Sequence, residues 1–102
     1  MFAKIKNMLF GPSIDYKQLL QNGAIILDVR SKGEFASGSL KDSKNVPLDT
    51  LSSYLVKLDK NKPVITCCAS GMRSGAAKNI LKSNGFNQVY NGGSWISLRN
   101  KI

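Results

Sequence analysis

Short apolar runs alternate with amphipathic stretches along the chain. Residues 24–29 read Ala-Ile-Ile-Leu-Asp-Val, and residues 64–67 form a second run that opens with Val-Ile. Near-continuous apolar runs of this length are typical of strands that are buried on both faces of a parallel sheet. Shorter strands are expected over residues 45–47 and 87–90.

Segments with helical periodicity separate these strands, over residues 14–21, 48–58 and 74–84. Ser13 is expected to cap the first helix, and Gly23 to end it. Ser31 and Glu34 have the spacing of a capping box, which predicts a short helical turn from Ser31 to about Gly38.

The apolar positions of the segment 48–58 are Leu48, Leu51, Leu55, Val56 and Leu58, and Gly85 is expected to end the helix at 74–84. A short segment with Trp95 follows Gly92 and Gly93. The alternation of strand and helix predicts an α/β fold with a mostly parallel sheet of four or five strands between helices. Ligands bind beyond the carboxyl ends of such strands.

The length of 102 residues suits one domain, with residues 1–12 as an N-terminal extension. The stretch from Met1 to Phe10 lacks the continuous apolar core and the cleavage pattern of a signal peptide. No apolar run approaches the ~20 residues that a membrane span needs. A cytoplasmic location is therefore expected, in which both cysteines stay reduced.

The formal net charge is +9, from 15 Lys and Arg against 6 Asp and Glu. The lysines are dispersed, and they form no basic block or basic strand with interleaved aromatic residues, so a nucleic-acid partner is not favoured. A solvated basic surface that attracts small anions is the better interpretation.

Histidine is absent, and only two cysteines are present. A Ser-His-Asp triad, a Cys-His pair and a His-ligated zinc site are therefore excluded, as is a four-thiolate metal site within one chain. No metal or cofactor is expected. A nucleophile in this chain would have to be activated by backbone dipoles and by Arg or Lys.

Residues 67–74 read Cys-Cys-Ala-Ser-Gly-Met-Arg-Ser and lie between a predicted strand and a predicted helix. A sulfur at the start of a helix faces free backbone N–H groups and the positive end of the helix dipole, and Arg73 adds a full positive charge. This pattern favours a reactive thiolate over a buried structural cysteine.

Five ordered segments of the chain resemble a single-domain rhodanese, a thiosulfate sulfurtransferase-like domain. They are Asp28-Val29-Arg30-Ser31 with Glu34-Phe35, then Gly38, then Asn45-Val46-Pro47, then Cys68 to Ser74, and finally Gly92-Gly93 with Trp95. The resemblance runs from about Ser13 to Trp95. It implies a small α/β domain whose parallel sheet lies between helices.

The resemblance implies that the Cys68 thiolate takes the outer sulfur of a donor such as thiosulfate and passes it from a persulfide to cyanide or a thiol. It also implies that the sulfur is stabilised by a loop of six residues: Ala69, Ser70, Gly71, Met72, Arg73 and Ser74. Arg73 either holds the sulfonate of thiosulfate or braces the loop. Asp28 and Arg30 are expected to support the site, as an ion pair that orders neighbouring loops.

Several alternatives stay open. Ser39 stands where many family members carry histidine. Cys67 and Arg73 have the spacing of cysteine-dependent phosphatases and arsenate reductases, although Thr66 replaces their usual histidine. Cys67 could also resolve a persulfide on Cys68, but a space-filling role as the buried last residue of the strand is favoured. Finally, the chain could be a sulfur carrier or interaction module whose basic surface docks an acidic protein.

Overall fold

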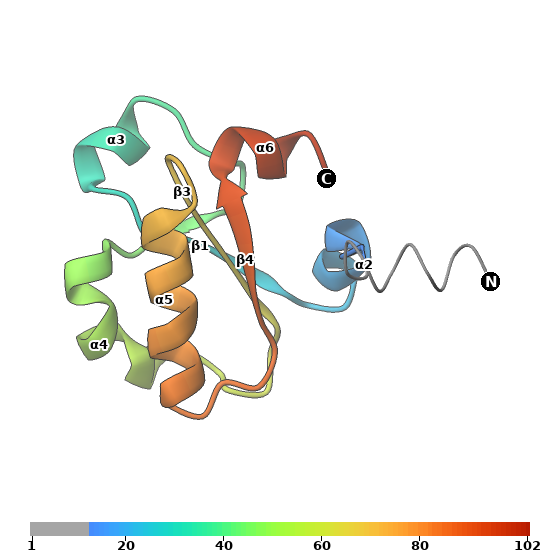
Figure 1. The fold of residues 1–102 in the computed structure, drawn as a ribbon, viewed down its shortest axis with the longest axis vertical. Helices are drawn as coiled ribbons and strands as arrows, with labels where there is room; N and C mark the ends of the chain where they lie inside the picture. The colour runs from blue at the N-terminus through green and yellow to red at the C-terminus, as the bar shows by residue number, and fades with distance from the viewer. Residues whose placement is uncertain (1–12) are drawn as a thin grey trace.

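The structure is a computed structural model that describes residues 13–102. Its sheet has four strands: β1 (Ile25–Asp28), β2 (Lys44–Asn45), β3 (Val64–Cys68) and β4 (Val89–Ser94). They lie in the order β2-β1-β3-β4, and every neighbouring pair is parallel (Figure 1). The predicted α/β fold is confirmed, and within residues 13–102 its four strands form only parallel pairs.

Helices cover both faces of the sheet. One apolar cluster joins the sheet to α4 (Leu51–Tyr54) and α5 (Met72–Ser83), and a second joins it to α2 (Tyr16–Gln21) and α6 (Trp95–Arg99). The short helix α3 (Lys32–Ala36) lies at the carboxyl end of the strands, where the arrowhead of β4 points and α5 begins (Figure 1).

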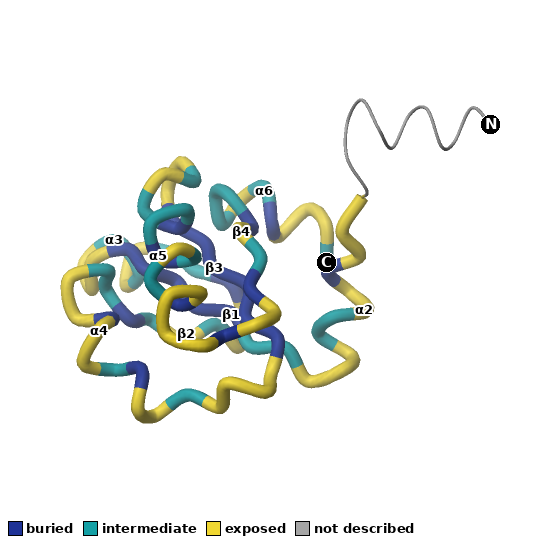
Figure 2. The backbone as a smooth tube through the Cα atoms, turned by 60° about the horizontal axis from the view of Figure 1, so that its bottom comes forward, coloured by how far each residue is buried: buried dark blue, intermediate teal, exposed yellow. Residues whose placement is uncertain are grey.

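Side chains alternate between the two clusters along the central strands, as the period of two in a β-strand requires. Leu27 and Val64 belong to the α5 cluster, whereas Ile26 and Ile65 belong to the α2 and α6 cluster. All five residues of β3 are buried, so this strand forms the centre of the fold (Figure 2).

Several local features match the sequence prediction. The capping box of Ser31 and Glu34 is present, with Ser31 Oγ accepting from the Glu34 amide at 3.2 Å and the Glu34 carboxylate accepting from the Ser31 amide at 3.1 Å. Gly23 and Gly85 end their helices with φ of 94° and 89°, a backbone region that glycine enters without steric cost.

The first helix begins later than predicted. Its cap is Asp15 rather than Ser13, because the Asp15 carboxylate accepts a hydrogen bond from the Gln18 amide at 3.0 Å. The helix therefore covers Tyr16–Gln21. The predicted N-terminal extension, residues 1–12, lies outside the described residues.

The prediction of one continuous helix over residues 48–58 is wrong. The segment consists of a 3-10 turn (Leu48–Thr50), the four-residue α4 and a second 3-10 turn (Leu55–Lys57). A 3-10 turn advances about 120° per residue, whereas an α-helix advances about 100°, so the apolar side chains no longer lie on one face. Val56, expected on the buried face, is 89% exposed.

The elements around the cysteines are shifted from their predicted bounds. β3 continues through Cys68, and α5 begins at Met72 rather than Ser74. The connecting loop is therefore only three residues long, 69–71. β4 is longer than predicted and leads directly into α6. Among residues 13–102, no helix is long and apolar enough to cross a membrane.

Candidate active site

Cys68 lies at the carboxyl end of β3 and faces the start of α5. Its Sγ accepts hydrogen bonds from the backbone amides of Gly71 at 3.0 Å and Ser74 at 3.3 Å, and the Ser74 hydroxyl oxygen is 3.4 Å away. The side chain is buried beneath the loop, whose residues Ala69 and Ser70 are exposed. The loop thus wraps around one sulfur atom.

The loop turns back on itself at Gly71. This residue has φ of 101°, a conformation that a side chain would strain, and its Cα lies opposite Gly93. The turn directs the Gly71 amide toward the sulfur. Met72, the next residue, is 83% exposed at the surface of the loop.

The environment favours the anionic form of Cys68. Burial alone raises the pKa of the Cys68 thiol, but hydrogen bonds to the sulfur outweigh burial and hold the pKa below its ordinary value. These bonds come from the Ser74 hydroxyl and from the backbone amides of Ser74, Gly71 and Ser70. The surroundings therefore favour the thiolate, which is the nucleophilic form of a cysteine.

Cys67 has the opposite environment, because it precedes Cys68 by one residue and points to the other face of the sheet. It belongs to the cluster beneath α2 and α6, and its side chain is fully buried. Burial, followed by the nearby Asp28 carboxylate, raises the pKa of Cys67 to about 12. The loop 69–74 does not face its sulfur, so the geometry gives no support to a phosphatase-like site centred on Cys67.

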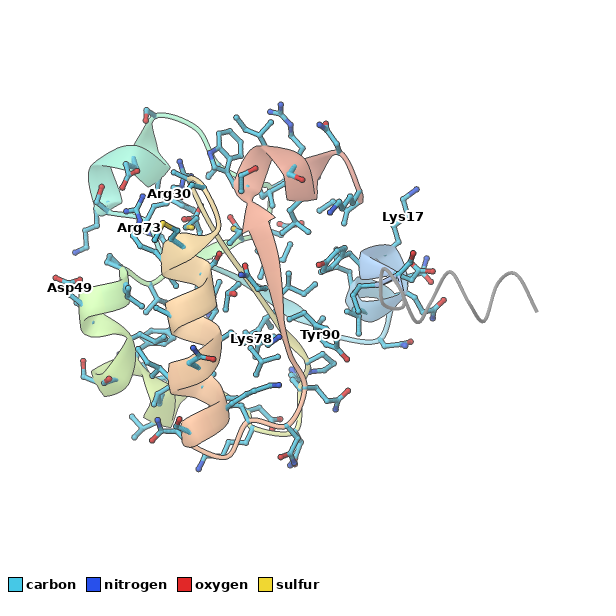
Figure 3. The ribbon with its side chains drawn as sticks, viewed as in Figure 1. Lys17, Arg30, Asp49, Arg73, Lys78 and Tyr90 are labelled. Atoms are coloured by element: carbon cyan, nitrogen blue, oxygen red, sulfur yellow. The ribbon has the colours of Figure 1, made fainter. Side chains whose placement is uncertain are left out.

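Arg73 binds a partner that the sequence analysis assigned only to helix capping. Its guanidinium donates two hydrogen bonds to the Glu34 carboxylate, at 2.7 and 2.9 Å, while Glu34 still caps α3. The ion pair, led by the Arg73 hydrogen bonds, lowers the pKa of Glu34 to about 2. In this state Arg73 braces the cysteine loop against α3 (Figure 3).

Asp28 and Arg30 form the predicted ion pair at the end of β1, with both side chains almost fully buried and 2.8 Å between the charged groups. The Arg30 guanidinium also donates to the backbone carbonyls of Glu34 at 3.2 Å and Gly38 at 2.6 Å. It packs over the Trp95 ring at 4.9 Å. This pair therefore orders the chain that carries Glu34, without contacting the sulfur.

Two residues that support the site, Thr66 and Asn91, were given no role in it from the sequence. The Thr66 hydroxyl donates to the Ser74 carbonyl at 2.8 Å and fixes the first turn of α5 to β3. The Asn91 side chain accepts from the Ser74 hydroxyl at 2.6 Å. A signal existed for Asn91, because it directly follows the strand predicted over residues 87–90, and parallel sheets bind ligands beyond the carboxyl ends of their strands.

A hollow of about 610 Å³ lies on the α3 side of the cysteine loop. Arg73 contributes to its lining from the first turn of α5, and Val29, Pro47 and Leu48 give it an apolar wall. Asp49 and Lys32 lie at its rim. Within residues 13–102, no three His, Cys, Asp or Glu side chains gather as metal ligands would.

Comparison with known proteins agrees with this geometry. The rhodanese-like domain model matches residues 14–94. The uncharacterised protein YqhL of Bacillus subtilis is 35% identical over 68 residues, which cover 67% of this chain and 54% of YqhL. The thiosulfate sulfurtransferase GlpE of Ectopseudomonas mendocina is 31% identical over 74 residues, which cover 72% of this chain and 68% of GlpE.

A solved structure described as a rhodanese with anions from E. coli superposes with a TM-score of 0.70 at 28% identity, covering 74% of this chain and 91% of that chain. The residues that the family model matches, 14–94, include the parallel sheet and the cysteine loop between β3 and α5. The chain belongs to the rhodanese-like domain family.

Proposed function

We propose that this protein is a sulfurtransferase that carries a single sulfur atom as a persulfide on Cys68. The Cys68 thiolate attacks the outer sulfur of thiosulfate, and a new sulfur–sulfur bond forms. The bond between the outer and central sulfurs breaks, and sulfite leaves with the electron pair. A thiophilic acceptor, cyanide or a thiolate, then attacks the outer sulfur and returns Cys68 as a thiolate.

The observation that carries this proposal is the pair of backbone amides, from Gly71 and Ser74, that donate to Cys68 Sγ. Fixed amides stabilise a sulfur anion without having to reorganise during the reaction. The loop has only three residues between β3 and α5, which suits a single sulfur better than a bulky oxyanion. The relatives named thiosulfate sulfurtransferase support thiosulfate as the donor.

Charge supports an anionic donor as well. The formal net charge of +9 attracts a dianion, although Arg73 at the mouth of the site is already paired with Glu34. Cys67 and Cys68 are both free thiols. The proposal includes a cytoplasmic location, where such thiols stay reduced.

The test is to incubate the protein with thiosulfate and to measure its intact mass. We expect one added sulfur atom in the wild type and in Cys67→Ser, and none in Cys68→Ser. A wild type that gains no sulfur, or a Cys68→Ser protein that does, would overturn the proposal.

Turnover separates an enzyme from a sulfur carrier. Addition of cyanide to the loaded protein should release thiocyanate and restore the original mass over repeated cycles. A persulfide that forms but is not removed by cyanide or by a small thiol would instead favour a carrier that delivers sulfur to a protein partner.

A further inference from the structure

The Ser74 hydroxyl has one proton and two neighbours that could receive it. Cys68 Sγ lies 3.4 Å from the hydroxyl oxygen, and Asn91 Oδ1 lies 2.6 Å from it. Ser74 is fully buried, so its hydroxyl needs a partner within the protein. Which neighbour receives the proton determines what the hydroxyl can do for the sulfur.

The orientation of the Asn91 amide is set by two further contacts. Oδ1 accepts from the Gly93 amide at 2.9 Å, and Nδ2 donates to the Gly71 carbonyl at 3.2 Å. Since an N–H and a C=O lie on the two sides of the side chain, a flipped amide would lose both hydrogen bonds. The atom facing Ser74 is therefore an oxygen, which has no proton to give.

It follows that Ser74 donates its proton to Asn91 and turns a lone pair toward Cys68. Such a contact is favourable when Cys68 carries a proton, because the thiol donates to Ser74 Oγ. It is unfavourable when the sulfur is an anion, since a lone pair then faces a negative charge. The Ser74 hydroxyl has to turn toward the sulfur before it can stabilise an anion there.

We propose that Asn91 is a positioning residue that competes with Cys68 for the Ser74 proton, holding it while the cysteine is a thiol and releasing it when the sulfur is an anion. This inference rests on the proposed function, in which the sulfur alternates between thiol, thiolate and persulfide. The backbone amides donate to the sulfur in every state, whereas the Ser74 hydroxyl joins them only in the anionic states.

The other charged and titratable groups around Cys68 do not change in this exchange. Arg73 at the start of α5 is held by Glu34, and the Asp28–Arg30 pair lies at the end of β1. Cys67 faces the opposite side of the sheet. Because Asn91 is exposed at the surface, substituting its side chain leaves no buried cavity.

The test measures the rate of alkylation of Cys68 by iodoacetamide as a function of pH, located by peptide mass. In Asn91→Ala the Ser74 hydroxyl loses its fixed acceptor, and the water that replaces it can donate as well as accept, so the hydroxyl is free to turn to the sulfur. The midpoint should therefore fall by roughly half a unit, and alkylation well below the midpoint should be about threefold faster. In Asn91→Asp the added charge and the retained acceptor should raise the midpoint by roughly half a unit.

The Ser74→Ala background provides the matched control. Without the hydroxyl, Asn91→Ala should leave the midpoint where Ser74→Ala alone places it. A midpoint that rises or stays unchanged in Asn91→Ala, or that falls equally in the Ser74→Ala background, would overturn the inference. A midpoint that does not rise in Asn91→Asp, a variant nearly identical in shape, would do the same.

Alkylation requires neither a sulfur donor nor an acceptor. Loss of sulfur loading from thiosulfate together with the predicted alkylation shifts would contradict the proposed function and leave the role of Asn91 intact. Normal sulfur loading without the alkylation shifts would contradict the role of Asn91 and leave the proposed function intact.

Discussion

Glu34 and Arg73 lie 39 residues apart in the chain and meet through two hydrogen bonds of 2.7 and 2.9 Å. The contact connects the capping box of α3 to the first turn of α5, next to the cysteine loop. Both side chains are more than one third exposed, so solvent weakens the attraction between them. The main effect of the pair is to position Arg73 and to neutralise its charge at the mouth of the site.

This pair predicts an acid-sensitive contribution to stability. The pKa of Glu34 is lowered from 4.5 to about 2, so the contribution is fully present above about pH 4.5 and is lost as the pH falls toward 2. In Glu34→Gln the capping box can still form, because glutamine serves at that position, but the charge is gone. Thermal melts should show a gap between the wild type and this variant that is constant near neutral pH and closes toward pH 2. A gap that does not depend on pH would contradict the assignment.

Cys67 and Cys68 should differ sharply in reactivity even though they are adjacent. With a pKa of about 12, Cys67 is a thiolate in only about one molecule in ten thousand at pH 8, and its side chain points away from the cysteine loop into the cluster beneath α2 and α6. Iodoacetamide should therefore label native wild-type protein at Cys68 alone. Native Cys68→Ser should remain unlabelled under the same conditions and gain one label on Cys67 after unfolding in guanidinium. Rapid labelling of Cys67 in the native variant would show that the assigned faces are wrong.

The parts of the fold set by local sequence could be predicted. The apolar run of β1, the capping box of Ser31 and Glu34, and the helix ends at Gly23 and Gly85 each depend on residues a few positions apart. The family resemblance, now confirmed, rested on motifs of the same local kind. The prediction of one continuous helix over residues 48–58 was wrong because the spacing of apolar residues does not show whether the backbone tightens into 3-10 turns.

Contacts between segments that are distant in the chain could not be predicted from local sequence patterns. Glu34 has a sufficient local role in the capping box, so nothing in the sequence indicated that it also binds Arg73. Asn91 precedes two glycines and suggests a turn, but its contact with Ser74 depends on the pairing of β4 with β3, in which Asn91 lies opposite Thr66. Local patterns do not encode that pairing between distant strands.

Removing the Asp28 carboxylate should destabilise the fold. Asp28→Asn leaves the buried Arg30 guanidinium without its countercharge, which costs about 3 kcal/mol in comparable buried pairs. Urea unfolding followed by circular dichroism measures this loss. Asp42→Asn is the matched control, because Asp42 is exposed and has φ of 64°, a region that asparagine tolerates well. Equal stability of the two variants would contradict a structural role for the Asp28–Arg30 pair.

Two glycines should respond in opposite ways to the same added methyl group. A Cβ on Gly92, which lies within β4, would be 2.9 Å from the Thr66 carbonyl oxygen and 3.0 Å from Leu98 Cδ2. Since the Thr66 carbonyl belongs to the central strand, it cannot move without disturbing the cysteine loop. Gly92→Ala should therefore lower the free energy of unfolding by about 2 kcal/mol.

A Cβ on Gly33 meets nothing within 4 Å, and the residue lies in the exposed first turn of α3. Gly33→Ala should raise the free energy of unfolding by roughly 0.5 kcal/mol, because alanine loses less backbone entropy on entering a helix. Urea unfolding of both variants measures the contrast. If Gly92→Ala were as stable as Gly33→Ala, the close approach of β4 to Thr66 would be wrong, and with it the register that brings Asn91 to Ser74.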